Sequence, residues 1–167
     1  MNSRSIPFLP ALLLAMLAGT AQASGNHAAD VGRPGVAAKV SRSVQVDMSD
    51  AMRFTPSSIE VKQGETLRLV VKNSGRLPHE LVIGSAQDLR AHEAQMKQHP
   101  GMVHADENLV SVAPGQTGEL VWQFTRAGKI EFACLQPGHF DAGMKGAFLV
   151  AGKQAKAGKD GHADHQH

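Results

Sequence analysis

Eight short runs of alternating apolar and polar residues occupy the middle of this chain and constrain its fold more than any other feature. Turn-forming residues separate the runs, which read SVQVDM, SIEVK, TLRLVVKN, HELVIG, NLVSVA, TGELVWQFT, GKIEFAC and GAFLVA. Alternation with a period of two places successive side chains on opposite faces of a strand. Many short strands bounded by turn residues are typical of an antiparallel β-sandwich or barrel. We therefore expect an all-β domain whose core includes Trp122 and Phe124.

The segment 86–99 is the exception to the strand pattern. It contains no β-branched residue, and alanine, glutamine, leucine, glutamate, methionine and lysine predominate. Ser85 is suited to the N-cap position, Asp88 lies in the first turn, and Pro100 with Gly101 would end the helix. The sequence thus predicts one α-helix inserted between strands.

Both ends of the chain differ from the middle in composition. Residues 1–23 combine a short basic start, the apolar run IPFLPALLLAMLAG and the small-residue sequence AQA, which predicts a secretory signal peptide. That run is shorter than the ~20 residues of a membrane-spanning helix, so we expect export without stable membrane insertion. Residues 24–40 and 152–167 lack periodicity, which predicts a flexible N-terminal segment and a disordered tail with lysines and histidines. One domain, residues 41–151, remains between them.

Charge and cysteine content limit the classes of function. The 17 basic residues nearly balance the 15 acidic ones, for a formal net charge of +2, which predicts no nucleic-acid partner. Cys134 is the only cysteine and cannot form an internal disulfide. In an exported protein, such a thiol is open to oxidation unless something occupies it, and a soft metal ion is one candidate.

Strand phase directs two metal-binding side chains toward the core. Along GKIEFAC, Cys134 falls on the same face as Ile130, and along HELVIG, His79 falls on the face that is expected to point inward. The loop after Cys134, LQPGHFDAGM, carries His139 and Met144, and a proline and a glycine tighten it. We therefore expect these four side chains to meet.

A thiolate, two imidazoles and a weak thioether are the ligand set of a type 1 copper site. The sulfur ligands favour Cu(I) and the imidazoles accept Cu(II), so an electron is exchanged with little rearrangement. Zinc is the nearest competitor, because two histidines and a cysteine suit it when water or a carboxylate completes the site, but Met144 argues against it. A Cys–His hydrolase is a further alternative, for which the chain shows no evident substrate-binding elaboration.

Longer stretches of the sequence resemble the cupredoxin family. PHELVIG and FACLQPGHFDAGM carry the resemblance, which covers about residues 42–151, and the spacing CxxxxHxxxxM is similar to the loops of auracyanin-like and azurin-like proteins. The resemblance implies a Greek-key β-sandwich with one copper ion at one end, held by His79, Cys134, His139 and Met144. Glu80 departs from the family pattern, in which asparagine commonly follows the first histidine and ties the two ligand loops together.

Two further stretches, DMSDAMRFTPSSIEVKQGETLRLVVKNSG and MKQHPGMVHADENLVSVAPGQTGELVW, resemble bacterial periplasmic cupredoxins associated with copper tolerance. This resemblance implies a monomeric periplasmic protein that cycles copper between Cu(I) and Cu(II) in copper handling and one-electron transfer, without turnover of an organic substrate. It also implies that a periplasmic redox or copper-trafficking protein docks near His139 and Phe140. The apolar residues of that surface would be Leu77, Pro78, Pro137, Phe140 and Ala142.

A second group of soft donors suggests an additional copper site. Its members are Met48, Met52, His92, Met96, His99, Met102 and His104. Within the predicted helix, Leu89, His92, Met96 and His99 share one face. Such a stripe is ordinarily core, but thioethers with imidazoles also suit Cu(I). The alternative function is therefore a copper carrier or buffer that binds extra Cu(I) through the helix and tail, and a metal-free adhesion domain is a third hypothesis.

Overall fold

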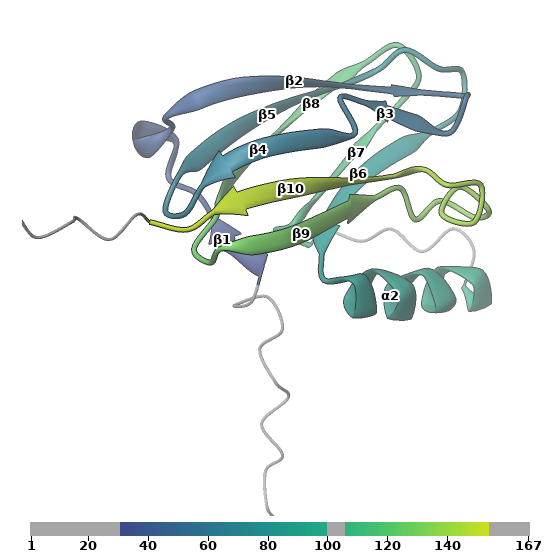
Figure 1. Cartoon of the computed structure of the whole chain (residues 1–167). Helices are drawn as coiled ribbons and strands as arrows, with labels where there is room; N and C mark the ends of the chain where they lie inside the picture. The colour runs from purple at the N-terminus through teal and green to yellow at the C-terminus, as the bar shows by residue number, and fades with distance from the viewer. Residues whose placement is uncertain (1–30, 100–105, 154–167) are drawn as a thin grey trace, which may run out of the picture.

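Two five-stranded sheets pack face to face in the computed structural model, which describes residues 31–99 and 106–153 (Figure 1). The first sheet, in the order β1-β8-β5-β2-β3, comprises Arg33–Pro34, Thr117–Gln123, Thr66–Asn73, Arg42–Ser49 and Arg53–Thr55. The second, in the order β4-β10-β9-β6-β7, comprises Ser58–Lys62, Lys145–Ala151, Gly128–Ala133, His79–Gly84 and Leu109–Val112. The expected all-β sandwich with one inserted helix is confirmed.

Alternating side chains build the core between the two sheets. In β5, Leu67, Leu69 and Val71 are fully buried, and the residues between them are more exposed. Trp122 and Phe124 belong to the same core, as the sequence predicts. Full burial of one such side chain stabilises the fold by roughly 1.5–3 kcal/mol, so the alternation itself holds the sheets together.

Helix α2 (Ala86–Gln98) covers the outer face of the second sheet (Figure 1). It begins where expected, because the Ser85 hydroxyl accepts the Asp88 N–H at 3.1 Å. Leu89 and Met96 are buried in a cluster with Val82, Ala133, Leu135 and Phe140. All six residues of β6 are buried, and on the outer face Val82 packs against Leu89 and Met96 of α2. Within the described ranges, no helix is long and apolar enough to cross a membrane.

Residues 31–40, which were expected to be part of a flexible segment, pack on the first sheet. Arg33–Pro34 pairs with β8, and the short 3₁₀ helix η1 (Ala37–Lys39) follows. The Val31 carbonyl accepts the indole N–H of Trp122 at 3.0 Å. Neither β1 nor β3 was expected, because two or three residues are too few to show alternation. The predicted signal peptide, residues 24–30, the helix stop at 100–101 and residues 154–167 lie outside the described residues.

Two strand pairs are parallel, in contrast to the expected antiparallel pattern. β2 pairs with β5, and β4 pairs with β10. β2 and β5 therefore end on the same side of the sandwich, where β6 begins and β9 ends. The turns 50–52, 74–78 and 134–144 gather there, and we call this side the loop end (Figure 1).

Candidate metal centre

Three of the expected ligands lie together at the loop end. Nδ1 of His79 is 3.2 Å from Nδ1 of His139, and Sγ of Cys134 is 3.9 and 3.4 Å from those two nitrogens. His79 and Cys134 are buried, and His139 is half-buried. Among the described histidines, cysteines and carboxylates, this is the one group whose donor atoms are close enough together to hold a metal ion.

The triangle formed by these donor atoms has the size that a metal ion requires. The point equidistant from the three atoms lies about 2 Å from each, which matches metal–imidazole bonds of about 2.0–2.1 Å and approaches metal–thiolate bonds of about 2.3 Å. Two imidazole nitrogens and one soft sulfur in a trigonal arrangement are the equatorial donors of a mononuclear type 1 copper site. The residues present therefore fit copper.

Strand register explains why His79 and Cys134 meet. His79 is the first residue of β6, and Cys134 directly follows β9. The antiparallel register sets Val82 opposite Ala133, so Cys134 comes opposite Leu81. His79 is two residues further along and on the same inner face, which is a diagonal neighbour position across a strand pair. The alternation seen in the sequence is thus sufficient to bring these two side chains together.

The loop from Cys134 to Met144 closes on itself. The N–H of Cys134 donates to the carbonyl of Met144 at 3.1 Å, and the N–H of Met144 donates to the carbonyl of His139 at 3.0 Å. Gly138 and Gly143 have φ angles of +82° and +90°, which residues with a side chain rarely adopt. Met144 is fully buried in the same apolar cluster as Cys134. The loop thus returns beside Cys134, and Met144 stays the candidate fourth ligand.

Burial controls the protonation of the site. It raises the pKa of the Cys134 thiol to about 11, and hydrogen bonds from the backbone N–H groups of Glu80 and Gln136 act in the opposite direction. Burial also lowers the pKa of His139, and the nearby His79 lowers it further. Without metal at neutral pH, Cys134 is a protonated thiol and His139 is neutral. Metal binding therefore has to displace the thiol proton.

Glu80 connects the two segments that carry the ligands. Its side chain is buried, and one carboxylate oxygen accepts the Leu135 N–H at 3.2 Å. The other oxygen accepts the side-chain amide of Gln136 at 3.2 Å and the hydroxyl of Ser111 at 3.4 Å. Glu80 thus links the strand that begins with His79 to the loop that carries Cys134 and His139.

Asp50 is a contact of the site that the sequence did not indicate. Its carboxylate lies 3.0 Å from Nε2 of His79. A hydrogen bond from the backbone N–H of Arg76 is the main cause that holds the pKa of Asp50 below its ordinary value. Asp50 is 29 residues before His79, and the two meet only because β2 and β5 are parallel and end together. No local feature of the sequence predicts the parallel pairing of β2 with β5.

The described members of the expected second copper site lie on both faces of the second sheet. Met48 and Met52 pack against the core between the sheets, whereas Met96 is buried under α2 on the outer face of the second sheet. His92 is half-buried on α2, and His99 is exposed at its C-cap. Met102 and His104 lie outside the described residues. Met48 and the helix residue Met96 therefore belong to different clusters. The second copper site stays a prediction.

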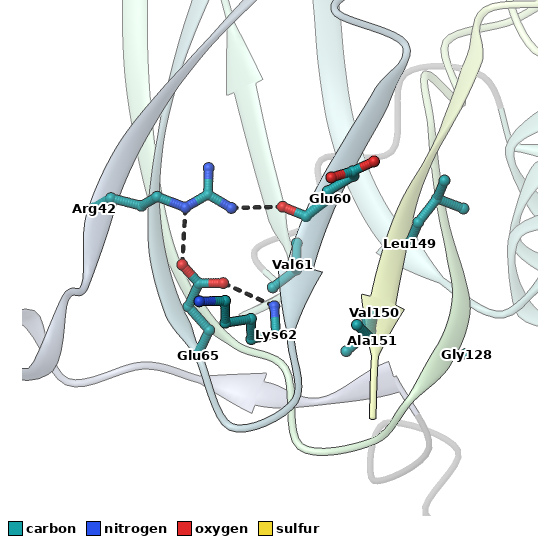
Figure 2. A pocket seen from close by; sticks show the side chains of 9 residues that line it. All are labelled: Arg42, Glu60, Val61, Lys62, Glu65, Gly128, Leu149, Val150 and Ala151. Atoms are coloured by element: carbon teal, nitrogen blue, oxygen red, sulfur yellow. Dashed lines mark hydrogen bonds and ion pairs between the residues drawn. The ribbon is translucent and has the colours of Figure 1, made fainter. Parts of the chain in front are cut away.

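A groove of about 860 Å³ is lined by residues from the start of β2 and from the ends of β4 and β10 (Figure 2). This end of the sandwich is opposite the loop end that holds Cys134, His79 and His139. Arg42 crosses it, donating to the carboxylate of Glu65 at 2.8 Å and to the carbonyl of Glu60. These contacts cover part of the free edge of β4, which limits strand pairing with other chains. No histidine or cysteine lines the groove, so it is separate from the metal centre.

The sandwich fold and the Cys–His–His cluster at its loop end define a cupredoxin, a mononuclear copper protein. Residues 40–151 match the family described as copper binding proteins, plastocyanin/azurin family, and the chain belongs to that family. It is 52% identical to the copper-resistant cuproprotein CopI of Rubrivivax gelatinosus over 157 residues, covering 84% of this chain and 95% of that protein. It is 39% identical to the protein of the same name from Pseudomonas aeruginosa, covering 85% and 96%.

Solved structures show the same fold at low sequence identity. Auracyanin B matches with a TM-score of 0.59 and 20% identity, covering 73% of this chain and 99% of that one. An azurin from Methylomonas sp. strain J matches with a TM-score of 0.54 and 18% identity, covering 67% and 99%. The resemblance to auracyanin-like and azurin-like proteins is thus confirmed for the fold.

Proposed function

We propose that the protein is an exported periplasmic cupredoxin that binds one copper ion through His79, Cys134, His139 and Met144 and contributes to copper tolerance. The observation that carries this proposal is the donor triangle of one thiol sulfur and two Nδ1 atoms. The copper-resistant cuproproteins, similar over nearly their whole length, support the tolerance role. Bound copper would supply a reversible one-electron change between Cu(I) and Cu(II).

The four proposed ligands would have different roles in this copper site. Cys134 supplies the soft thiolate, and His79 supplies a buried imidazole whose other nitrogen, Nε2, contacts Asp50 at 3.0 Å. His139 is half-buried and is the ligand nearest to solvent, and the fully buried Met144 would be the weak fourth donor. Cys134 is fully buried, whereas a catalytic thiol must be reachable by its substrate. This burial favours metal binding over a Cys–His hydrolase.

Copper titration of the full chain tests this function. We expect one equivalent of Cu(II) to produce an intense visible absorption band, because a bound thiolate donates charge to the metal, and ascorbate to bleach it reversibly. Absorption and EPR spectra recorded at increasing copper give the stoichiometry. Two or more tightly held ions, with the extra ones preferring Cu(I), would support the carrier function instead. Failure to bind copper would support the adhesion hypothesis.

We further propose that a periplasmic redox or copper-trafficking partner docks on the surface around His139. Leu77 is 43% exposed there, and Pro78, Pro137 and Ala142 are exposed as well. Phe140 is only 8% exposed and packs under α2, with the Lys145 ammonium 4.0 Å from its ring centre. Phe140 therefore supports the docking surface from below. Small apolar interfaces suit transient electron-transfer contacts.

The docking surface predicts a selective effect of Leu77→Gln. We expect electron self-exchange between the Cu(I) and Cu(II) forms of the variant to slow about tenfold, equivalent to ~1.4 kcal/mol, because apolar contact is lost in both copies. NMR line broadening measures the rate. Leu149→Gln is the matched control: Leu149 is 45% exposed in β10, at the distant groove of Figure 2. Equal slowing by both variants would refute this surface.

A further inference from the structure

Asp50 makes three hydrogen bonds that connect separate segments of the loop end. Its Oδ2 accepts the N–H of Arg76 at 2.8 Å, and its Oδ1 accepts the N–H of Leu77 at 3.2 Å. The same Oδ1 lies 3.0 Å from Nε2 of His79. The Asp50 side chain is 36% exposed, whereas the His79 side chain is completely buried. One carboxylate thus joins the β2–β3 turn to the backbone that leads into His79.

This contact determines which nitrogen of His79 carries the proton. A neutral imidazole has one N–H, and an ionised carboxylate can only accept hydrogen bonds. In the neutral ring, Nε2 of His79 is therefore the donor to Asp50, and the lone pair lies on Nδ1, the atom that faces His139 and Cys134. His139 offers a ring nitrogen that can donate or accept, so it imposes no choice of its own. Asp50 thus favours the tautomer with the proton on Nε2.

The backbone around Asp50 is shaped to hold the carboxylate in place. A Cβ at Gly75 would approach Oδ1 of Asp50 to 2.1 Å, so a larger residue there would displace the carboxylate from this position. The Asn73 side chain accepts the N–H of Gly75 at 2.9 Å and donates to the carbonyl of Leu77 at 2.8 Å. Asn73 is fully buried and donates to Val112 as well, which anchors the turn 74–78 to the sandwich. The carboxylate is thus pre-organised.

We propose that Asp50 is the positioning residue of the metal centre: it holds the His79 ring with Nδ1 deprotonated and directed at the metal. The proposal rests on the proposed function of His79 as a copper ligand. A carboxylate on the far nitrogen of a ligating imidazole fixes the orientation of the ring and raises its basicity. Its negative charge also favours Cu(II) over Cu(I), because Cu(II) carries the larger positive charge.

The test compares Asp50→Ala and Asp50→Asn with the unsubstituted full chain. Long-range ¹H–¹⁵N NMR of the metal-free protein reports the tautomer of His79, and competition with chelators gives the Cu(II) and Cu(I) affinities. We expect the Nε2–H tautomer alone in the unsubstituted chain and a mixture of tautomers in Asp50→Ala. Cu(II) affinity should fall by about 10–100-fold, and Cu(I) affinity should fall less.

Asp50→Asn keeps an acceptor for the backbone N–H groups if the alanine variant folds poorly, and it should also weaken Cu(II) binding more than Cu(I) binding.

Glu80→Gln is the matched control, because it removes a buried carboxylate near the site without touching the His79 ring. It should leave the tautomer unchanged. A single Nε2–H tautomer in Asp50→Ala, with Cu(II) affinity within about twofold of the original, would overturn the proposal on the magnitude expected for such contacts. The NMR measurement needs no copper, so it separates this result from failure of the proposed function, which would appear as an unsubstituted chain without the thiolate band.

Discussion

Replacing Cys134 by serine is expected to abolish the intense visible band of the copper-loaded protein and to weaken Cu(I) binding by at least about 100-fold. Removal of a residue that only hydrogen-bonds to a metal ligand lowers metal affinity by about 10–100-fold. Removal of a directly bound thiolate should lower it further. Serine keeps the size of the side chain but replaces a soft, ionisable sulfur by a hard hydroxyl that stays protonated. Absorption, EPR and chelator competition measure the change.

Two controls separate ligand loss from damage to the fold. Cys134 is completely buried, and a buried hydroxyl without a good partner costs roughly 1–3 kcal/mol, so Cys134→Ala should be compared with the serine variant. Both should lack the band, while urea unfolding of the metal-free forms reports their stabilities. His99→Ala changes an exposed histidine outside the cluster and should keep the band. A band that persists in Cys134→Ser would exclude the thiolate as a ligand.

The strands and the helix could be predicted because their signals are local. All eight alternating runs became strands, since each buries one row of side chains, and Ser85 caps α2 as its residue type suggests. The parallel pairing of β2 with β5 could not be predicted. Alternation states which face is apolar and says nothing about the neighbour or direction of a strand.

The same distinction applies to the metal centre. His79 and Cys134 were predicted to face inward from strand phase, and the structure brings them together with His139. The contact of Asp50 with His79 depends on pairing between strands that are far apart in the sequence, so it could not be predicted. The hydrogen bond from Leu135 to Glu80, which connects β6 to the loop after β9, is likewise visible only in the structure. The sequence also placed Phe140 on the surface, whereas α2 covers it. A helix that packs on an outer face conceals residues that loop position alone would expose.

Copper affinity is expected to rise with pH, by about tenfold per unit and about 100-fold between pH 7 and pH 9. The pKa of the buried Cys134 thiol is raised to about 11, so the metal-free protein holds that proton throughout this range. The pKa of His139 is lowered, so its ring is already neutral and releases nothing. Each copper ion bound should therefore release one proton from Cys134, and a lower proton concentration favours binding in direct proportion.

Proton release can be measured directly by adding copper to weakly buffered protein at pH 7.5 with an indicator dye. We expect one proton per copper ion for the unsubstituted chain, and a smaller value for Cys134→Ser, which has no thiol to deprotonate. Two influences compete at the sulfur: burial favours the thiol, and the N–H groups of Glu80 and Gln136 favour the thiolate. Copper binding without proton release would mean that these hydrogen bonds outweigh burial and that the metal-free protein already contains the thiolate.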